Sequence, residues 1–304
     1  MMYDVCIIGA GPAGISSAIY AASRGMKTIV FEEKRVGGVL AGVSTVTHYA
    51  GIVEAETGSS FAERLKKQAE SAGVTICMEK VDAVQLVGDV KQIRTAQNQY
   101  ESTTVILAAG TTPKKLGIPG EEEFAGKGIG MNAASSAEAY KGKEMFVVGG
   151  ADGAVKEAIY LANYASKVTI IHFEDQLGAI AEFKEKIKQN DKIELKLHSR
   201  LIQVEGSQQV DRLVLQDEHT KERHTIDSAG CAVFIYAGSV PNTQMFCQLE
   251  NRDGYLVTDE KQQTKIAGVY AAGDITAKQI RQAATAVSDG AIAGINAALY
   301  CSNF

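Results

Sequence analysis

The residues whose types and spacing could do chemistry begin with a group of glycines near the N-terminus and an acid that follows them. The apolar run 3–8 predicts a strand that leads into Gly9-Ala10-Gly11-Pro12-Ala13-Gly14, and a helix and a second strand then end at Glu32. In such a turn the first glycine allows the tight bend, the second lets the backbone approach a pyrophosphate, and the third lets helix and strand pack closely. The helix N-terminus offers N–H donors to phosphates, and the carboxylate can accept ribose hydroxyls. This order predicts a dinucleotide site.

A second segment repeats this plan. The segment KEMFVV, residues 143–148, predicts a strand that leads into Gly149-Gly150-Ala151-Asp152-Gly153-Ala154, and a helix and a further strand end at His172. The spacing from Gly149 to His172 equals the spacing from Gly9 to Glu32, which indicates an internal duplication. Ala151 stands where a second glycine would let a pyrophosphate approach, so its methyl group crowds that contact.

The cysteines carry no paired motif. None of them forms a C-x-x-C, their number is odd, and we expect free thiols. Cys6 and Cys231 lie in apolar runs that predict small buried side chains. A disulfide reductase that used Cys301 or Cys77 would need a second cysteine close in space. The five are Cys6, Cys77, Cys231, Cys247 and Cys301.

Length and composition indicate an ordinary globular chain with two domains. The 304 residues exceed one typical core, and 45% are hydrophobic and 22% charged. The net charge is −5, with no basic block to follow a phosphate backbone, so we expect no nucleic-acid partner. No apolar run approaches the ~20 residues that span a bilayer, and the N-terminus enters a strand directly. We therefore expect a cytoplasmic protein with no membrane partner.

Further stretches of the sequence indicate which dinucleotide binds and which family the chain resembles. Residues 36–42 form another glycine turn, and the strand 103–107 leads into Ala108-Ala109-Gly110. Near the C-terminus a strand ends in Gly273-Asp274, followed by Arg281-Gln282 and a long alanine-rich helix. With these segments the chain resembles, over nearly its whole length, the low-molecular-weight thioredoxin reductase branch of the FAD/NAD(P)-linked disulfide oxidoreductases. The resemblance implies FAD at the first glycine turn.

The resemblance also implies a domain organisation. The fold would be α/β, with two Rossmann-like three-layer nucleotide-binding domains, the second inserted into the first. Residues 1–113 and 246–304 would form the FAD-binding domain, and residues 114–245 the inserted NAD(P)-binding-like domain. A homodimer is implied as well.

Individual FAD contacts follow from the same resemblance. Gly38, Val39 and Leu40 would line the isoalloxazine ring, and Asp274 would hold a hydroxyl of the ribityl chain or, through water, a phosphate. His48 replaces an asparagine that resembles a flavin contact, and a solvated loop histidine is the equal alternative. The full implied set is Gly9, Gly11, Pro12, Ala13, Gly14, Glu32, Gly38, Val39, Leu40, His48, Val81, Ala109, Gly110, Gly273, Asp274, Arg281, Gln282 and Ala283.

Two segments depart from the family pattern. Where the family has an H-R-R-x-x-x-R clamp for the 2′-phosphate of NADPH, the segment 172–178 reads HFEDQLG and has no arginine. NADPH is therefore not the expected nucleotide. Glu174 could accept the ribose hydroxyls of NADH, and the alternative is that no pyridine nucleotide binds.

The second departure concerns the redox-active cysteines. The family's C-A-T-C-D motif matches a segment that has Asn132 and Ser135 at the two cysteine positions and Ser136 at the acid. Neither Asn nor Ser can carry electrons, so we expect no dithiol chemistry. Asn132 or Ser135 would cap a short helix, with Glu138 three residues after Ser135. We favour this capping role over a polar wall that faces the flavin.

The leading hypothesis is an FAD-dependent oxidoreductase without dithiol chemistry. Its donor would be NADH or a reduced ferredoxin-like protein, its acceptor something other than thioredoxin, and a small electron-carrier protein is a candidate partner. The alternative hypothesis is an FAD-binding sensor or complex subunit with little or no NAD(P)H turnover.

Overall fold

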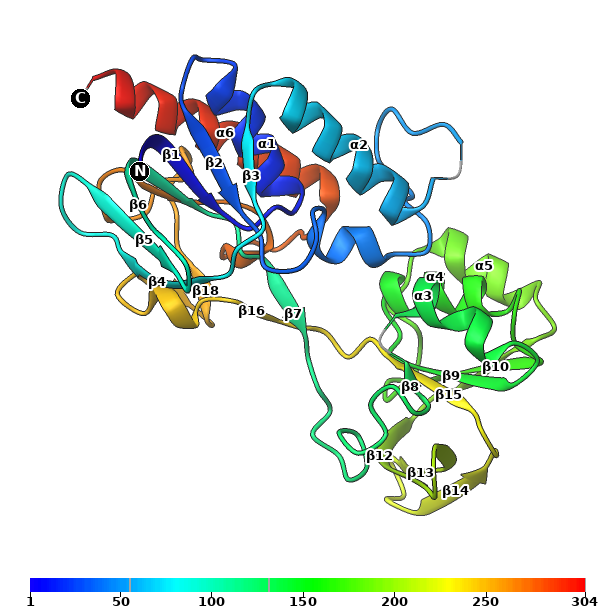
Figure 1. The fold of residues 1–304 in the computed structure, drawn as a ribbon. Helices are drawn as coiled ribbons and strands as arrows, with labels where there is room; N and C mark the ends of the chain where they lie inside the picture. Colours follow the sequence, from blue (N-terminus) through cyan, green and yellow to red (C-terminus); the bar gives the residue numbers. More distant parts are fainter. Residues whose placement is uncertain (55, 131, 304) are drawn as a thin grey trace. The chain divides into compact units, whose positions relative to one another are not determined.

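The computed structural model describes residues 1–54, 56–130 and 132–303 (Figure 1). Contacts between Cα atoms divide the chain into two compact units. The first unit comprises Met1–Thr112 and Val240–Phe304, and the second comprises Pro113–Ser239. The second unit therefore interrupts the sequence of the first.

A largely parallel sheet forms the centre of the first unit. Its strands follow the order β3-β2-β1-β6-β5-β4, and β19 pairs with the last residues of β6. The β1, β2, β3, β6 and β19 strands run parallel, whereas β4 and β5 form an antiparallel extension beside the first half of β6. The strands are β1 (Met2–Ile8), β2 (Thr28–Phe31), β3 (Thr75–Cys77), β4 (Val81–Gln85), β5 (Lys91–Thr95), β6 (Gln99–Leu107) and β19 (Val269–Ala271).

Three helices cover one face of this sheet (Figure 1): α1 (Pro12–Ala22), α2 (Gly58–Ser71) and α6 (Ala283–Ser302). The α1 and α6 helices touch along their backbones. A Cβ added at Gly290 of α6 would lie 2.2 Å from the carbonyl oxygen of Ala13, and one at Gly294 would lie 2.3 Å from that of Ser17. The opposite face packs on a separate core that includes Phe246, Leu249 and Leu256. The short elements of this unit are η1 (Gly38–Gly42), η3 (Gln244–Phe246), β17 (Asn251–Arg252), β18 (Tyr255–Leu256) and η4 (Gly273–Ile275).

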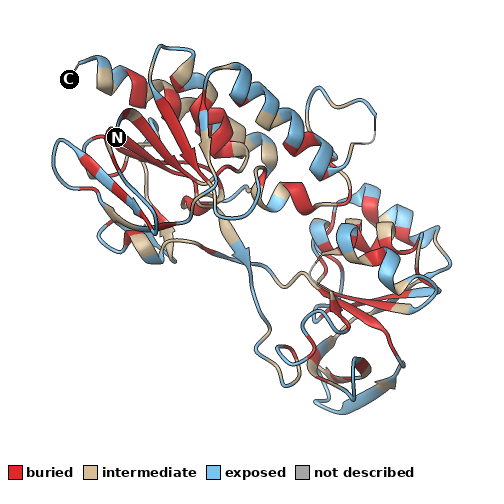
Figure 2. Ribbon diagram, viewed as in Figure 1, coloured by how far each residue is buried: buried red, intermediate tan, exposed pale blue. Residues whose placement is uncertain are grey.

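The second unit repeats this layered plan. Its five-stranded parallel sheet has the order β11-β10-β9-β15-β8 and lies between helices and a three-stranded antiparallel sheet, β12-β13-β14. The central strands of the parallel sheet in each unit are largely buried, as Figure 2 shows, whereas the edge strands β3 and β11 and the outer strand β14 are more exposed. The strands are β8 (Ile129–Gly130), β9 (Glu144–Val148), β10 (Lys167–Ile171), β11 (Ile193–Lys196), β12 (Ser199–Gly206), β13 (Val210–Asp217), β14 (Arg223–Asp227) and β15 (Ala232–Ile235). The helices are α3 (Ala133–Ser136), η2 (Ala137–Tyr140), α4 (Asp152–Leu161) and α5 (Ala181–Lys188).

The connecting segments pair with each other as β7 (Thr111–Pro113) and β16 (Ser239–Pro241). We expected the inserted part to extend to residue 245, but residues 240–245 belong to the first unit. Hydrogen bonds explain this difference, since the backbone N–H of Asn242 donates to Gly110 at 3.0 Å and its side-chain amide donates to Ala109 at 2.7 Å. Within the described ranges, no helix has the length and apolar character needed to cross a membrane.

Candidate functional site

The first glycine turn joins β1 to α1 and leaves its middle residue open. Gly9 has a φ of +103°, and a Cβ there would lie 2.3 Å from the carbonyl oxygen of Ala108. A Cβ at Gly14 would lie 1.8 Å from the carbonyl oxygen of Gly9, so helix and turn are in backbone contact. At Gly11, by contrast, a Cβ would meet no atom of the described chain within 4 Å. The backbone therefore presents an open approach at the position where the motif predicts a pyrophosphate.

The carboxylate of Glu32 is held against this turn. Its Oε2 accepts a hydrogen bond from the backbone N–H of Ala10 at 3.0 Å, and its Oε1 accepts from the N–H groups of Lys34 and Arg35. These bonds fix a negative charge at the end of β2, beside the N-terminus of α1. An ionised carboxylate has lone pairs left that could accept the two ribose hydroxyls expected at this position.

Two further loops meet the same turn. The backbone N–H of Gly37 donates to Ala10 at 2.8 Å, and a Cβ at Gly38 would lie 3.5 Å from the Cα of Gly11. From the C-terminal segment, a Cβ at Gly273 would lie 2.7 Å from the Cβ of Ala13. Segments that are far apart in sequence therefore converge around the N-terminus of α1.

Asp274 presents a buried acceptor in this region. Its Oδ1 is buried, with no hydrogen-bond partner among the described residues. Burial raises the pKa of Asp274, and the positive charges of Lys278 and Arg281 oppose this effect. A buried carboxylate oxygen without a partner costs about 1–3 kcal/mol or more. A ligand hydroxyl would remove this cost, so the site fits the ribityl chain of FAD.

The residues after Asp274 are positioned by side-chain contacts. Arg281 donates to the backbone carbonyls of Asp274 and Thr276, and its guanidinium carbon lies 3.9 Å from the ring centroid of Tyr255. Gln282 is the N-cap of α6 and shares a capping box with Thr285, which makes Ala283 the first residue of the helix. The N–H groups of this helix start therefore stand beside the Asp274 loop, where they favour an anion.

Asp289 is a residue that the sequence analysis missed. Its Oδ2 accepts from the backbone N–H of Gly273 at 3.0 Å and from the Nζ of Lys278 at 2.5 Å. It therefore holds the Gly273-Asp274 turn on α6. An acid inside an alanine-rich helix gives no local signal for this contact, because the contact joins two segments that only the fold brings together.

The other residues predicted to contact FAD differ in how far they are exposed. Val39 and His48 are exposed, and His48 adopts a φ of +55° in its loop. Leu40, Ala109 and Gly110 are half-buried. The side chain of Val81 packs in the core on the far face of the sheet, so any contact of Val81 with FAD would use its backbone.

The second glycine turn has the same backbone but different side chains. Gly149 has a φ of +136°, and Ala151 is the N-cap of α4. The ring of His172 covers the turn, since a Cβ at Gly150 would lie 2.5 Å from its Nε2. His172 is buried, and its Nε2 lies 3.2 Å from the Oε2 of Glu174. Counted from the first glycine of each turn, Glu174 therefore lies two residues farther along the chain than Glu32.

An arginine that the sequence analysis missed lies beside this loop. The guanidinium carbon of Arg200, on β12, is 4.7 Å from the ring centroid of Phe173, which follows β10. Its Nε donates to the carboxylate of Glu218, so the positive charge is already paired. The sequence could not indicate this contact, because Arg200 lies on a different sheet of the unit.

The segment that would hold the family's cysteines forms a capped helix. The side-chain oxygen of Asn132 accepts a hydrogen bond from the backbone N–H of Ser135 at 3.1 Å, at the start of α3. The predicted capping is therefore confirmed, with Asn132 rather than Ser135 as the cap. Glu138 lies in the next short helix, η2, instead of completing a capping box.

Comparison with known proteins agrees with this architecture. The family model described as "Pyridine nucleotide-disulphide oxidoreductase" matches residues 3–290. A thioredoxin reductase from Peptoclostridium acidaminophilum is 39% identical over 305 residues, which cover 98% of this chain and 97% of that protein. The crystal structure of Lactococcus lactis thioredoxin reductase is similar with a TM-score of 0.95 and 32% identity, over 99% of this chain and 100% of that one. The predicted fold of two Rossmann-like domains, the second inserted into the first, is confirmed.

A second similar structure has a different name. It is a ferredoxin-flavin thioredoxin reductase from Clostridium acetobutylicum, 30% identical, with a TM-score of 0.55 over 100% of this chain and 99% of that chain.

The open backbone at Gly11 yields a direct test. The protein should purify yellow with FAD bound, and Gly11→Val should lower its flavin content to near zero, because a branched side chain would occupy the approach of the pyrophosphate. Since no described atom lies near a Cβ at Gly11, the variant should fold. The matched control is Gly153→Val in the second turn, where a Cβ also has open space. The measurement is the ratio of flavin to protein absorbance, and a colourless wild type that takes up no FAD would refute the assignment.

The burial of Asp274 yields a test of pH dependence. Since burial raises the folded-state pKa above the unfolded value of about 3.9, ionisation of Asp274 destabilises the flavin-free protein. This penalty is absent below the unfolded pKa, grows as the pH rises from the unfolded to the folded pKa, and is fully present above the folded pKa. Asp274→Asn should therefore raise the free energy of unfolding at neutral pH but not at pH values below about 3.9.

Denaturant unfolding of the flavin-free protein at a series of pH values measures this effect. The exposed Asp191→Asn serves as control and should change the unfolding free energy little at any pH. A variant at Asp274 that is less stable than wild type throughout the pH range would count against the argument.

Proposed function

This chain belongs to the pyridine nucleotide-disulphide oxidoreductase family, and from this premise we propose that it passes electrons through FAD to an acceptor other than thioredoxin, without dithiol chemistry. Family membership implies an FAD-dependent oxidoreductase with FAD and a pyridine nucleotide as cofactors. The finer proposal concerns the donor, the acceptor and the absence of a redox-active cysteine pair. The observation that carries it is the helix cap formed by Asn132 and Ser135 at the positions of that pair.

The chain's own residues supply a site for FAD in this proposal. The open backbone at Gly11 admits the pyrophosphate, and Glu32 accepts ribose hydroxyls. The buried Oδ1 of Asp274 accepts from a hydroxyl of the ribityl chain, and the start of α6 places N–H donors beside it. When bound, FAD supplies the electron-transfer chemistry.

The absence of a dithiol is supported by the state of the cysteines. Burial raises the pKa of Cys6 and of Cys231 to about 12, and it also raises the pKa of Cys77 and Cys301. The nucleophile in disulfide exchange is the thiolate, so these four thiols are poorly suited to it near neutral pH. Cys301 is also engaged, since its Sγ donates to the carbonyl oxygen of Asp4 at 3.3 Å.

NADH is the pyridine nucleotide that the second site favours. The residues after β10 place the carboxylate of Glu174 near the glycine turn, where it can accept the two ribose hydroxyls of NADH. The 2′-phosphate of NADPH would meet this carboxylate instead of arginines. Arg200 brings a positive charge beside Phe173 in this loop, but Glu218 already pairs with it.

A reduced ferredoxin-like protein is the alternative donor in the proposal. It draws support from the similar structure whose name includes ferredoxin. A small electron-carrier protein as partner, a homodimer and a cytoplasmic location complete the proposal, and each remains a prediction.

Anaerobic reduction of the bound flavin measures whether the protein prefers NADH or NADPH. Each lost arginine–phosphate bond contributes about 1.5–3 kcal/mol, so losing two weakens NADPH binding roughly a hundredfold or more. Flavin absorbance should therefore bleach at far lower NADH than NADPH concentrations, and Glu174→Gln should reduce this preference. The variant Glu218→Gln, which releases Arg200 from its ion pair, should strengthen NADPH more than NADH.

The outcomes of this titration separate the hypotheses. Bleaching by reduced ferredoxin alone supports the protein donor. Tight saturation by NADPH with weak NADH contradicts the argument from the missing arginines. If no donor bleaches the flavin, the FAD-binding sensor or complex subunit is the better account.

Disulfide turnover provides a separate test of the missing dithiol. With either pyridine nucleotide as donor, the protein should reduce neither thioredoxin nor an aromatic disulfide above the rate without enzyme, because Asn132 and Ser135 cannot form the reducible pair. The readout is thiol release followed by absorbance. Turnover that disappears in Cys301→Ser but persists in Cys247→Ser would show that Cys301 acts as a redox thiol, contrary to this proposal.

A further inference from the structure

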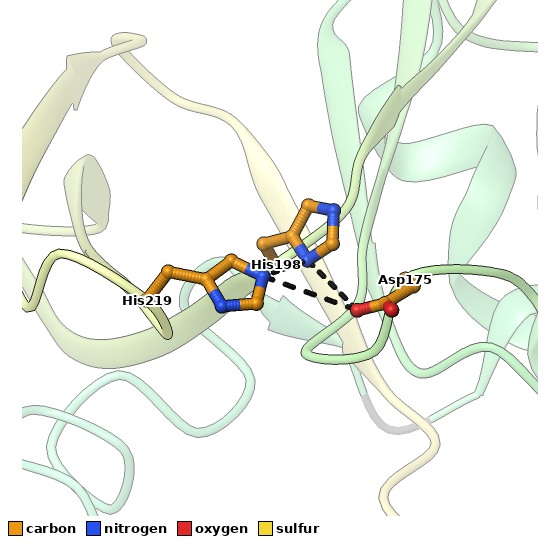
Figure 3. Close-up of side chains that lie close together, drawn as sticks. All are labelled: Asp175, His198 and His219. Carbon is orange, nitrogen blue, oxygen red and sulfur yellow. Dashed lines mark hydrogen bonds and ion pairs between the residues drawn. The ribbon is translucent and has the colours of Figure 1, made fainter.

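Three potential metal ligands from separate loops meet in the second unit (Figure 3). Asp175 lies in the loop after β10, His198 in the turn between β11 and β12, and His219 in the turn between β13 and β14. As Figure 3 shows, the carboxylate and the two imidazole rings point toward one another. The three residues lie apart in sequence, so only the fold brings them together.

The three ligand atoms form a small triangle. The Nδ1 of His198 lies 2.7 Å from the Nε2 of His219 and 3.1 Å from the Oδ1 of Asp175, and the third side, from His219 to Asp175, is 3.9 Å. A point inside a triangle with these sides lies about 2.0 Å from all three atoms, which is the length of a Zn–N or Zn–O bond. We propose that Asp175, His198 and His219 form a binding site for a divalent transition-metal ion.

Hydrogen bonding within the group does not satisfy all three atoms. Suppose that the Nδ1 of His198 accepts a hydrogen bond from the Nε2 of His219. The lone pair of that Nδ1 then also faces the carboxylate oxygen of Asp175, and these two acceptors repel each other. If the same nitrogen donates instead, one hydrogen must be shared between two acceptors. A single cation at the common point accepts the lone pairs of all three atoms at once.

Backbone hydrogen bonds hold the three loops together without a metal. The N–H of His198 donates to the carbonyl oxygen of Glu174, the residue before Asp175, at 3.3 Å. The N–H of Glu218, the residue before His219, donates to the carbonyl oxygen of His198 at 2.7 Å. The side chain of Asp217 accepts from the N–H groups of His219 and Thr220 at 2.8 Å and fixes that turn. The site is therefore preorganised by bonds that do not involve the ligand atoms.

The backbone of His198 adds an independent observation. Its φ of +51° lies in the left-handed region, which non-glycine residues adopt at a cost of roughly 1–3 kcal/mol. This conformation lets the turn between β11 and β12 present the ring toward Asp175. A strained residue held in place by its neighbours is typical of a position where the side-chain direction matters.

The ligand set indicates the class of ion. Two imidazole nitrogens and one carboxylate oxygen suit Zn²⁺, Co²⁺, Ni²⁺ or Cu²⁺, whereas Mg²⁺ and Ca²⁺ prefer all-oxygen sites. The group is partly exposed, with His198 half-buried and Asp175 and His219 exposed, so water can complete the coordination. An ion here would link the loop after β10 to the β13–β14 hairpin and stabilise the folded state by mass action.

The test uses the untagged full-length protein, so that no histidine tag competes for metal. Titration with Zn²⁺ alone by calorimetry should show one ion per chain, and Zn²⁺ should raise the melting temperature. Addition of Co²⁺ should give visible absorption bands of a nitrogen- and oxygen-ligated ion, without the charge-transfer band of a thiolate. Each of His198→Asn, His219→Gln and Asp175→Asn should weaken Zn²⁺ binding by at least about tenfold. Asparagine is chosen at position 198 because it tolerates a positive φ.

Two matched controls make the result decisive. His224→Gln removes an exposed imidazole from β14 of the same unit, and Cys247→Ser removes the exposed thiol. Both should bind Zn²⁺ as wild type does, and metal-free melting curves should show that all five variants fold. If the three ligand variants bind Zn²⁺ as tightly as wild type, or if binding is lost with Cys247→Ser, the proposed site is overturned. Failure of wild type to bind Zn²⁺ or Co²⁺ also overturns it.

Discussion

The first unit depends on one constraint: at several glycines, two backbone segments lie in direct contact, with no room for a side chain. Gly9 and Gly14 bring the start of α1 against β6 and its own turn, and Gly290 brings α6 against α1. Any side chain at these positions would overlap a carbonyl oxygen, so the strand, the turn and both helices have one close arrangement. The open backbone at Gly11 and the buried acceptor at Asp274 exist because these contacts hold three distant segments around a single helix start.

The two glycine turns show how one backbone plan can support different chemistry. Both begin with a glycine at positive φ, and both lead into a helix. In the first, Glu32 bonds the turn through its carboxylate and Gly11 leaves the approach open. In the second, the His172 ring covers the turn and Ala151 adds a methyl group at the helix start. The two sites therefore differ in their side chains and not in their fold.

The second unit also shows a helix start that is stabilised by a polar side chain. A short helix needs a cap for its free N–H groups, and the Asn132 side chain provides one without a thiol. Around the strand ends of the same unit, charged and aromatic side chains are paired with one another, as Arg200 is with Phe173 and Glu218. In this unit the layers form the core, and the residues at its loops carry the polar and aromatic contacts.

The sequence by itself determined the layered α/β plan and the local geometry of the first glycine turn. Turn glycines, strand runs and the acid after the second strand act over short distances, so the predicted strand 3–8 differs from β1, Met2–Ile8, by one residue. The fold alone decided which distant side chains meet: Asp289 holds Gly273, Arg200 stacks on Phe173, and Asp175 joins two histidines from other turns. Such contacts depend on strand order and loop packing, which no local pattern encodes, because the paired residues are neighbours in space only after the sheets have formed.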